Sequence, residues 1–286
     1  MCQGEMKKAI SASRRTDLVA FFTRWLAAAI RQEKARVHSP SGHSFIADLS
    51  PRTVHTFVLW SKDYSHLLEN HHGLRDGLKK YDQVYFHFTV TGLGGSFIER
   101  GVPEPDTALS QLEGLIAIAG TPRRISVRLD PVVHWEEEGL AKTNFHFIEK
   151  LAGKAHSLGI TDIRTSFAQW YGKAVKRAEK QNFRFLDPSP EDKREVARQL
   201  AQVARVHGLA LYACSQNFLG EVPGIRPSAC IDGKLLQELH PNREPLSQIK
   251  DKSQRQECLC TESVDIGSYT QICPHACLYC YANPRV

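Results

Sequence analysis

Residues 8–214 alternate between two patterns of hydrophobic and polar positions. Short runs rich in β-branched and aromatic residues predict strands, and longer segments with an apolar residue every three or four positions predict helices. We predict strands at 8–13, 56–61, 84–90, 124–130, 162–167 and 209–214. We predict helices at 18–33, 64–80, 106–119, 141–158 and 190–207. Such alternation is typical of βα units on a parallel sheet.

Six strand–helix units indicate an α/β fold and favour a partial (β/α)6 TIM-like barrel over a full eight-unit barrel, with a doubly wound sheet as the alternative. We expect residues 1–214 to form this barrel-like core and residues 215–286 to form a cysteine-rich iron–sulfur segment that closes the barrel mouth. Two stretches interrupt the alternation. Residues 36–50 indicate an inserted hairpin-like loop, and residues 173–189 form a basic segment.

Polar side chains follow the predicted strands, where parallel α/β folds gather their functional residues. Arg14 and Arg15 follow the first strand, Lys62 follows the second, and Asp130 ends the fourth. A planar guanidinium group is suited to a carboxylate or phosphate, so we predict that these four residues are catalytic contacts in a polar pocket. Alternatively, either Arg14 or Arg15 forms a salt bridge to Asp17 or Asp130 instead of contacting a ligand.

The loops after the first and third predicted strands begin with residues that can cap a helix or contact a ligand. Thr16 or Asp17 is expected to cap the helix that begins near residue 18. Thr91 and Gly92 open a glycine-containing loop in which a ligand can approach the backbone, although such a loop also needs glycine for positive φ angles. We therefore count Thr91 and Gly92 as candidate cofactor contacts.

Composition and charge limit the classes of protein to which the chain can belong. The chain has 286 residues, 42% of them hydrophobic, which is enough for a sizeable core. No stretch reaches eighteen uncharged apolar residues and the start lacks an apolar signal segment, so we expect a cytoplasmic protein without a membrane partner. The formal net charge of +6 comes from scattered Lys and Arg residues. This charge permits a nucleic-acid or phosphorylated partner without requiring one.

Eight cysteines are present, and five of them fall in the last 29 residues, which favours metal ligation over packing. Cys273, Cys277 and Cys280 have the spacing C-x3-C-x2-C. Three thiolates can hold three corners of a cubic iron–sulfur cluster and leave the fourth iron open. The alternative is a zinc site completed by one of the residues Cys258, Cys260 and His275.

The remaining cysteines give a second candidate site. Cys214, Cys230, Cys258 and Cys260 are four in number, as a closed [4Fe–4S] cluster requires. The alternative is that Cys214 and Cys230 are small buried hydrophobic residues. For Cys2 we expect a terminal thiol without a ligand role.

The cysteine spacing with Tyr279 before the last cysteine resembles the motif of the radical S-adenosylmethionine (radical SAM) superfamily, most closely its spore photoproduct lyase-like branch. Ser13-Arg14-Arg15-Thr16-Asp17, Asp265-Ile-Gly-Ser-Tyr269 and Cys280-Tyr-Ala-Asn283 resemble a bacterial family of unknown function, DUF1848. The second resemblance covers nearly the whole chain and supplies no reaction. The superfamily motif usually follows the first strand, so we expect residues 264–269 to form a strand that takes the opening position in a circularly permuted order.

The radical SAM resemblance implies a [4Fe–4S] cluster, S-adenosyl-L-methionine as cofactor, and a 5′-deoxyadenosyl radical that acts on an unknown small-molecule or nucleic-acid substrate. It also implies an electron donor such as flavodoxin or ferredoxin. Tyr279 would contact the adenine, and Arg14 or Arg15 would hold the methionyl carboxylate. The competing hypothesis is a non-enzymatic zinc or iron–sulfur module that binds nucleic acid.

Overall fold

The computed structural model describes residues 6–38, 43–181 and 183–285, so Cys2 lies outside the described residues. The chain folds into two compact units, each built from three segments. The first unit comprises Met1–His87, Glu113–Ile125 and Ala229–Gln271. The second unit comprises Phe88–Leu112, Ser126–Ser228 and Ile272–Val286.

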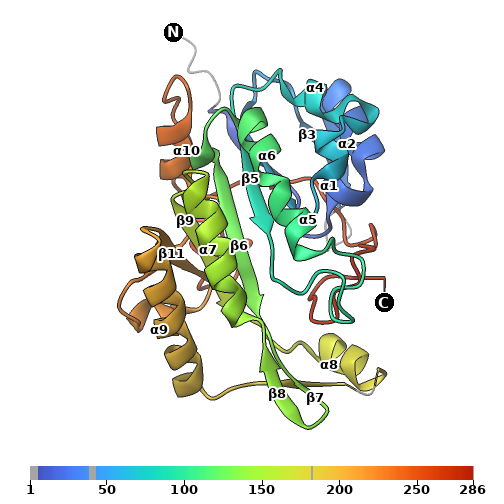
Figure 1. Cartoon of the computed structure of the whole chain (residues 1–286). Coiled ribbons are helices and arrows are strands. Elements are labelled where there is room, and N and C mark those ends of the chain that lie inside the picture. Colours follow the sequence, from blue (N-terminus) through green and yellow to red (C-terminus); the bar gives the residue numbers. More distant parts are fainter. Residues whose placement is uncertain (1–5, 39–42, 182, 286) are drawn as a thin grey trace. The chain divides into compact units, whose positions relative to one another are not determined.

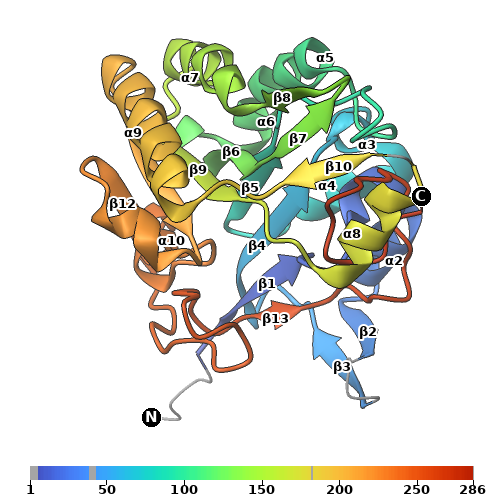
Figure 2. The ribbon, with the colours of Figure 1, turned by 90° about the horizontal axis from the view of Figure 1, so that it is seen from below.

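The fold is mixed α/β and contains an eight-stranded sheet in the order β12-β11-β9-β6-β5-β4-β1-β13 (Figures 1 and 2). Its strands are β1 (Lys8–Ala12), β4 (Val54–Ser61), β5 (Val84–Thr89), β6 (Ile125–Val132), β9 (Asp162–Phe167), β11 (Ala210–Cys214), β12 (Ile225–Ser228) and β13 (Val264–Asp265). The pairs β1–β4, β1–β13, β6–β9, β9–β11 and β11–β12 are parallel. All six predicted strands of the βα units are confirmed, and β12 adds to them.

Strand β13 lies beside β1, with Ile10 opposite Val264 and Ser11 opposite Asp265 (Figure 2). The sequence predicted a strand over 264–269, but the regular strand covers only its first two residues. The amide of Ile266 still donates to the Ser11 carbonyl. The amide of Gly267 instead donates to the Asp265 side chain, which ends the ladder.

The helices of the first unit are shorter than the sequence predicted. The segment 18–33 forms α1 (Leu18–Phe21) and α2 (Thr23–Arg31), which are separated at Phe22. Asp17 caps α1 by accepting from the Ala20 amide at 2.9 Å, which confirms one of the two predicted caps. The other helices here are α3 (Ser65–Leu68), η1 (His71–Gly73), α4 (Leu74–Leu78), α6 (Leu112–Ala119), η2 (Pro122–Arg124) and α10 (Gly233–Leu239).

The predicted insertion at 36–50 is an antiparallel hairpin of β2 (Lys34–His38) and β3 (Ser44–Asp48), as expected.

Helix α7 (Ile148–Ser157) of the second unit lies along β6 (Figure 1). Its other helices are α5 (Pro105–Ser110), η3 (Phe145–Phe147), α8 (Gly172–Glu179), α9 (Pro190–Val206) and η4 (Asn217–Glu221). A second sheet has the order β10-β7-β8, with β7 (His134–Glu137), β8 (Leu140–Thr143) and β10 (Arg184–Leu186). The predicted helix over 141–158 was therefore wrong in its first part. Glu138 and Gly139 have positive φ angles, which make the β7–β8 turn.

No helix in the described ranges has the length and apolar character needed to cross a membrane.

Candidate functional site

The three cysteines of the C-terminal motif lie in a loop that the backbone closes on itself, within the second unit. The amide of Cys273 donates to the Asn283 carbonyl at 3.2 Å, and the amide of Arg285 donates to the Cys273 carbonyl at 2.8 Å. Cys277 is buried, and Cys273 and Cys280 are half-buried. The amide of Ala282 donates to Cys280 Sγ at 3.3 Å. We call residues 273–285 the cysteine loop.

The cysteine loop is anchored on the segment that follows β5. The amide of Gly101 donates to the His275 carbonyl at 3.0 Å, and His275 Nδ1 lies 2.8 Å from the Gly101 carbonyl. The amide of Leu278 donates to the Ile98 carbonyl at 3.0 Å. A Cβ atom at position 101 would lie 2.3 Å from the Pro274 carbonyl oxygen, so this contact requires glycine.

Tyr279, the aromatic residue of the motif, is held by Glu99. Its hydroxyl donates a hydrogen bond to the Glu99 carboxylate, and Glu99 is fully buried. The Tyr279 ring packs against a hydrophobic cluster that includes Ile98. Burial, followed by the negative charge of Glu99, raises the pKa of Tyr279 well above its ordinary value. The hydroxyl is thus fixed by the protein, while the residue as a whole is half-buried.

Arg177 on α8 fixes the other side of the cysteine loop. Its Nε donates to the Leu278 carbonyl at 3.1 Å, and Nη2 donates to the Cys280 carbonyl. Burial lowers the Arg177 pKa, and the nearby thiols of Cys280 and Cys277 oppose that shift. The basic segment 173–189 is visible in the sequence, but the contacts of Arg177 and Glu99 with the cysteine loop were not predicted. Neither residue belongs to a motif or follows a predicted strand directly.

Asp130 is oriented by two neighbours at the end of β6. It forms an ion pair with Arg128 and accepts a hydrogen bond from Ser166 on β9. Arg128 is 6% exposed, so this ion pair lies largely away from water. Asp130 therefore presents a fixed carboxylate in the second unit, and its contact with a substrate stays a prediction.

Thr91 and Gly92 are tightly packed. The Thr91 carbonyl accepts from the Asn144 side chain at 2.9 Å, and its hydroxyl accepts from the Leu93 amide at 3.3 Å. Gly92 has φ +78°, and a Cβ atom there would lie 2.5 Å from the Phe147 ring. Packing alone thus explains this glycine, and its contact with a cofactor stays a prediction.

Arg14 and Arg15 both belong to the first unit, where each lies near an acidic side chain. Arg14 Nη2 donates to Ser263 Oγ at 2.6 Å, and Nη1 lies 3.6 Å from the Asp251 carboxylate. Arg15 Nη1 donates to the Gly267 carbonyl at 2.9 Å, and its Nε lies 3.8 Å from Asp265. These acidic partners come from the C-terminal part of the chain, which sequence proximity could not indicate.

Asp17 has different partners in the first unit. It accepts hydrogen bonds from the Ser61 hydroxyl and from the backbone amide of Lys62 at 3.0 Å. The N-terminal cap of α1 is thereby joined to the end of β4. This contact fixes the Lys62 backbone at the end of β4. A catalytic contact by the Lys62 side chain stays a prediction.

Asp265 joins β13 to the Arg14 segment. Its carboxylate accepts from the hydroxyls of Ser11 at 2.9 Å and Ser13 at 2.8 Å. It also accepts from the backbone amides of Arg14 at 2.9 Å and Gly267 at 3.1 Å. The two-residue strand β13 is thus held largely through one side chain.

Three of the four cysteines predicted for a second site come together in the first unit. The Cys260 thiol is in hydrogen-bonding contact with those of Cys230 and Cys258. Cys214, the last residue of β11, belongs to the second unit and is half-buried. Arg14 lies nearby. Burial alone would lower the Arg14 pKa, but Cys260, Asp265, Asp251 and Cys230 raise it.

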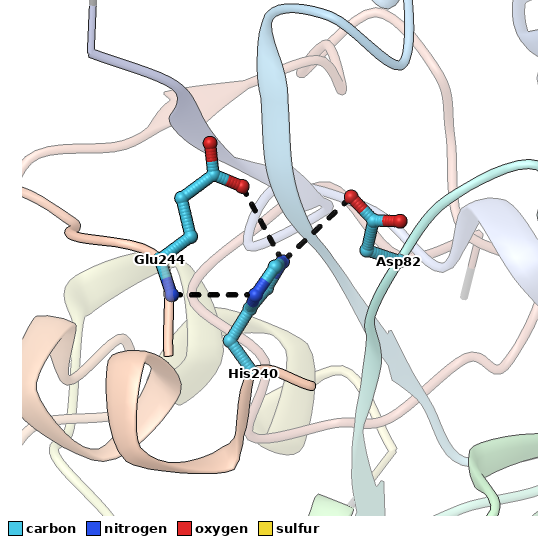
Figure 3. Close-up of side chains that lie close together, drawn as sticks. All are labelled: Asp82, His240 and Glu244. Atoms are coloured by element: carbon cyan, nitrogen blue, oxygen red, sulfur yellow. Dashed lines mark hydrogen bonds and ion pairs between the residues drawn. The ribbon is translucent and has the colours of Figure 1, made fainter. Parts of the chain in front are cut away.

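Another group with metal-binding residue types is Asp82, His240 and Glu244 (Figure 3). Lys7 already forms ion pairs with Asp82 at 3.3 Å and with Glu244 at 2.9 Å. His240 Nδ1 accepts from the backbone amides of Asn242 and Glu244, so in the neutral ring Nε2 carries the proton. A protonated nitrogen cannot ligate a metal. The group is therefore a charge cluster that joins the start of β1 to the segment after α10.

The structure therefore defines a mixed α/β protein with a parallel sheet, an anchored loop of three cysteines and a second group of three buried cysteines. The chain belongs to the family described as "Domain of unknown function (DUF1848)", whose model matches residues 9–282. No curated protein matches the sequence.

Several solved structures are distantly similar. A D-hydantoinase has 12% identity and a TM-score of 0.35, with 91% of this chain and 63% of that chain covered. Dihydropyrimidinase from Brevibacillus agri NCHU1002 has 14% identity and a TM-score of 0.34, with 88% and 53% covered. A mutant of morphinone reductase in complex with tetrahydroNAD has 14% identity and a TM-score of 0.32, with 77% and 55% covered. The chain spans less than two thirds of the length of each, and these scores carry no argument about function.

Proposed function

We propose that this chain is a radical SAM enzyme in which Cys273, Cys277 and Cys280 hold a [4Fe–4S] cluster with one iron open to the cofactor. The observation that carries the proposal is the closed, anchored cysteine loop, which contains the three cysteines of the motif and no fourth cysteine. When bound, such a cluster supplies the electron that cleaves S-adenosyl-L-methionine and yields a 5′-deoxyadenosyl radical, which then acts on an unknown substrate.

The residues of the loop fit such a cluster. Cluster-bound thiolates are stabilised by hydrogen bonds to sulfur, and the Ala282 amide donates one to Cys280. Arg177 holds the carbonyl of Cys280 and places a positive charge near the thiols, which favours their deprotonated form. Because Glu99 fixes the Tyr279 hydroxyl, the ring is the part of Tyr279 that we propose contacts the adenine.

The strand-end residues are proposed substrate and cofactor contacts. We propose that Arg14 or Arg15 holds the methionyl carboxylate and that Lys62 and Asp130 contact the substrate. Thr91 and Gly92 would contribute backbone contacts to the cofactor. We also propose that the parallel strands form a partial barrel in which β13 takes the opening position, and that flavodoxin or ferredoxin reduces the protein in the cytoplasm.

The proposal is tested by anaerobic reconstitution with iron and sulfide, followed by reduction in the presence of S-adenosyl-L-methionine and assay of 5′-deoxyadenosine. The wild-type protein should produce 5′-deoxyadenosine, and Cys280→Ala should not. Ile272→Ala is the matched control because Ile272 precedes the loop and is 53% exposed. It should retain the activity.

Reconstituted protein that holds iron and sulfide but releases no 5′-deoxyadenosine would contradict the enzymatic proposal. Zinc bound by the cysteine loop, with no uptake of iron, would favour the non-enzymatic nucleic-acid-binding module instead.

A further inference from the structure

A second group of three cysteines lies in the first unit. Cys230, Cys258 and Cys260 are 6%, 7% and 3% exposed. The Cys260 thiol contacts both of the others, yet none of the three is in a disulfide. Two chain segments that are 28 positions apart at their nearest cysteines therefore bring three sulfur atoms to one buried place.

Backbone hydrogen bonds hold these segments in register. The amide of Ile231 donates to Cys260 Sγ at 3.4 Å, and the amide of Thr261 donates to the Ile231 carbonyl at 2.9 Å. The amide of Asp251 donates to the Cys260 carbonyl at 2.9 Å. Gly233 lets the segment after Cys230 lie against Ser247 and Thr261, because a Cβ atom there would lie 2.2 Å from the Ser247 carbonyl oxygen and 3.2 Å from Thr261 Oγ1. Backbone hydrogen bonds between the two segments thus position the cysteines.

A positively charged side chain lies beside these three cysteines, unlike the apolar surroundings of cysteines that merely fill a core. The Arg14 side chain, which is 15% exposed, lies beside the Cys260 segment: its Nη1 is 3.6 Å from the Asp251 carboxylate, and the Asp251 amide donates to the Cys260 carbonyl. Three thiolates around a doubly charged metal group carry a net charge of about −1, which one arginine can balance.

We propose that Cys230, Cys258 and Cys260 form a second thiolate-ligated metal centre, separate from the cysteine loop and independent of the proposed function. Zn²⁺ and an iron–sulfur cluster both use this ligand chemistry. Three protein thiolates suffice for the proposal, so it does not require Cys214.

The test uses the full chain with Cys273, Cys277 and Cys280 all changed to alanine, purified without oxygen. Zinc, iron and acid-labile sulfide are counted per chain. We expect about one zinc, or about four iron and four sulfide, to remain. Adding Cys260→Ser should lower this content by about tenfold. Adding Leu259→Ala should not, because Leu259 lies between the two ligands and is 48% exposed.

Two further measurements keep the outcome independent of folding. Circular dichroism melting shows whether each variant is folded, and X-ray absorption at the metal edge of the Cys260-intact protein should show sulfur neighbours. The inference is overturned if this folded protein carries neither metal, if mass spectrometry finds a disulfide among the three cysteines, or if Leu259→Ala loses as much metal as Cys260→Ser. A wild-type chain that forms no 5′-deoxyadenosine would contradict the proposed function but not the second metal centre.

Discussion

The hydroxyl of Tyr279 donates a hydrogen bond to the buried carboxylate of Glu99, a residue 180 positions earlier in the chain. This contact ties the aromatic residue of the cysteine motif to the segment after β5. It also explains how a carboxylate is tolerated in a fully buried position, because hydrogen bonding compensates part of its lost hydration.

Tyr279→Phe should therefore destabilise the protein by about 1–3 kcal/mol, since it removes a donor from a buried charged group. Adding Glu99→Gln to Tyr279→Phe should restore part of the loss, because a neutral amide costs less to bury than a carboxylate. Urea unfolding of the wild type, both single variants and the double variant measures this coupling. Strictly additive effects would show that the two residues act independently.

Arg177→Met should weaken cluster retention, since methionine keeps much of the length but cannot donate to the carbonyls of Leu278 and Cys280. We expect iron to be lost to a chelator about tenfold faster than from the wild type, as when residues that hydrogen-bond to metal ligands are removed. Lys176→Met is the control because Lys176 is the exposed neighbour on the same helix. Equal rates of iron loss from both variants would refute a specific role for Arg177.

The strands could be predicted because their information is local. Runs such as Val-Tyr-Phe-His-Phe-Thr in β5 are buried almost throughout, so nearly every position is apolar or β-forming. Strand β13 has only two residues, and only its position was predictable. The helix expected to begin at 141 failed because the turn at Glu138 and Gly139 redirects the following residues into a hairpin.

The candidate site was predictable only where its residues share a short motif. The spacing of Cys273, Cys277 and Cys280 is visible in the sequence, but the residues that hydrogen-bond to the cysteine loop are not. Arg177 lies 103 positions before Cys280, whose carbonyl it holds. Arg14 pairs with Asp251 because β13 brings the C-terminal segment alongside β1. Such partners depend on strand order, which periodicity does not specify.

Asp265→Asn should destabilise the first unit by about 2–4 kcal/mol. The carboxylate accepts from Ser11, Ser13, Gly267 and the Arg14 amide, whereas an asparagine side chain has only one acceptor oxygen. Hydrogen exchange of the Ile266 amide, which donates to Ser11, should accelerate accordingly. Asp106→Asn is the control, since Asp106 is exposed and its ion pair with Lys150 contributes little. A loss below about 0.5 kcal/mol in Asp265→Asn would mean that β13 is held by other contacts.

His134, the first residue of β7, gives a pH-dependent prediction. It is half-buried and stacks on Phe167 with the ring centroids 6.0 Å apart. Burial, assisted by the positive charge of Lys193, lowers the pKa of His134 to about 4. Between about pH 6.5 and pH 4 the unfolded chain therefore binds more protons at this residue than the folded chain does. The stability contribution of His134 is complete above that window and is lost as the pH falls through it.

His134→Phe should remove this pH dependence while keeping an aromatic ring against Phe167. The full shift would correspond to about 3 kcal/mol, and partial exposure of the side chain reduces the expected effect to about 1–2 kcal/mol. Unfolding free energies of the wild type and His134→Phe, measured from pH 7 to pH 4, should thus differ progressively, with the wild type losing more stability. His72→Asn, at an exposed histidine, should follow the wild type. Parallel curves for the wild type and His134→Phe would show that this histidine is protonated as readily in the folded protein as in the unfolded chain.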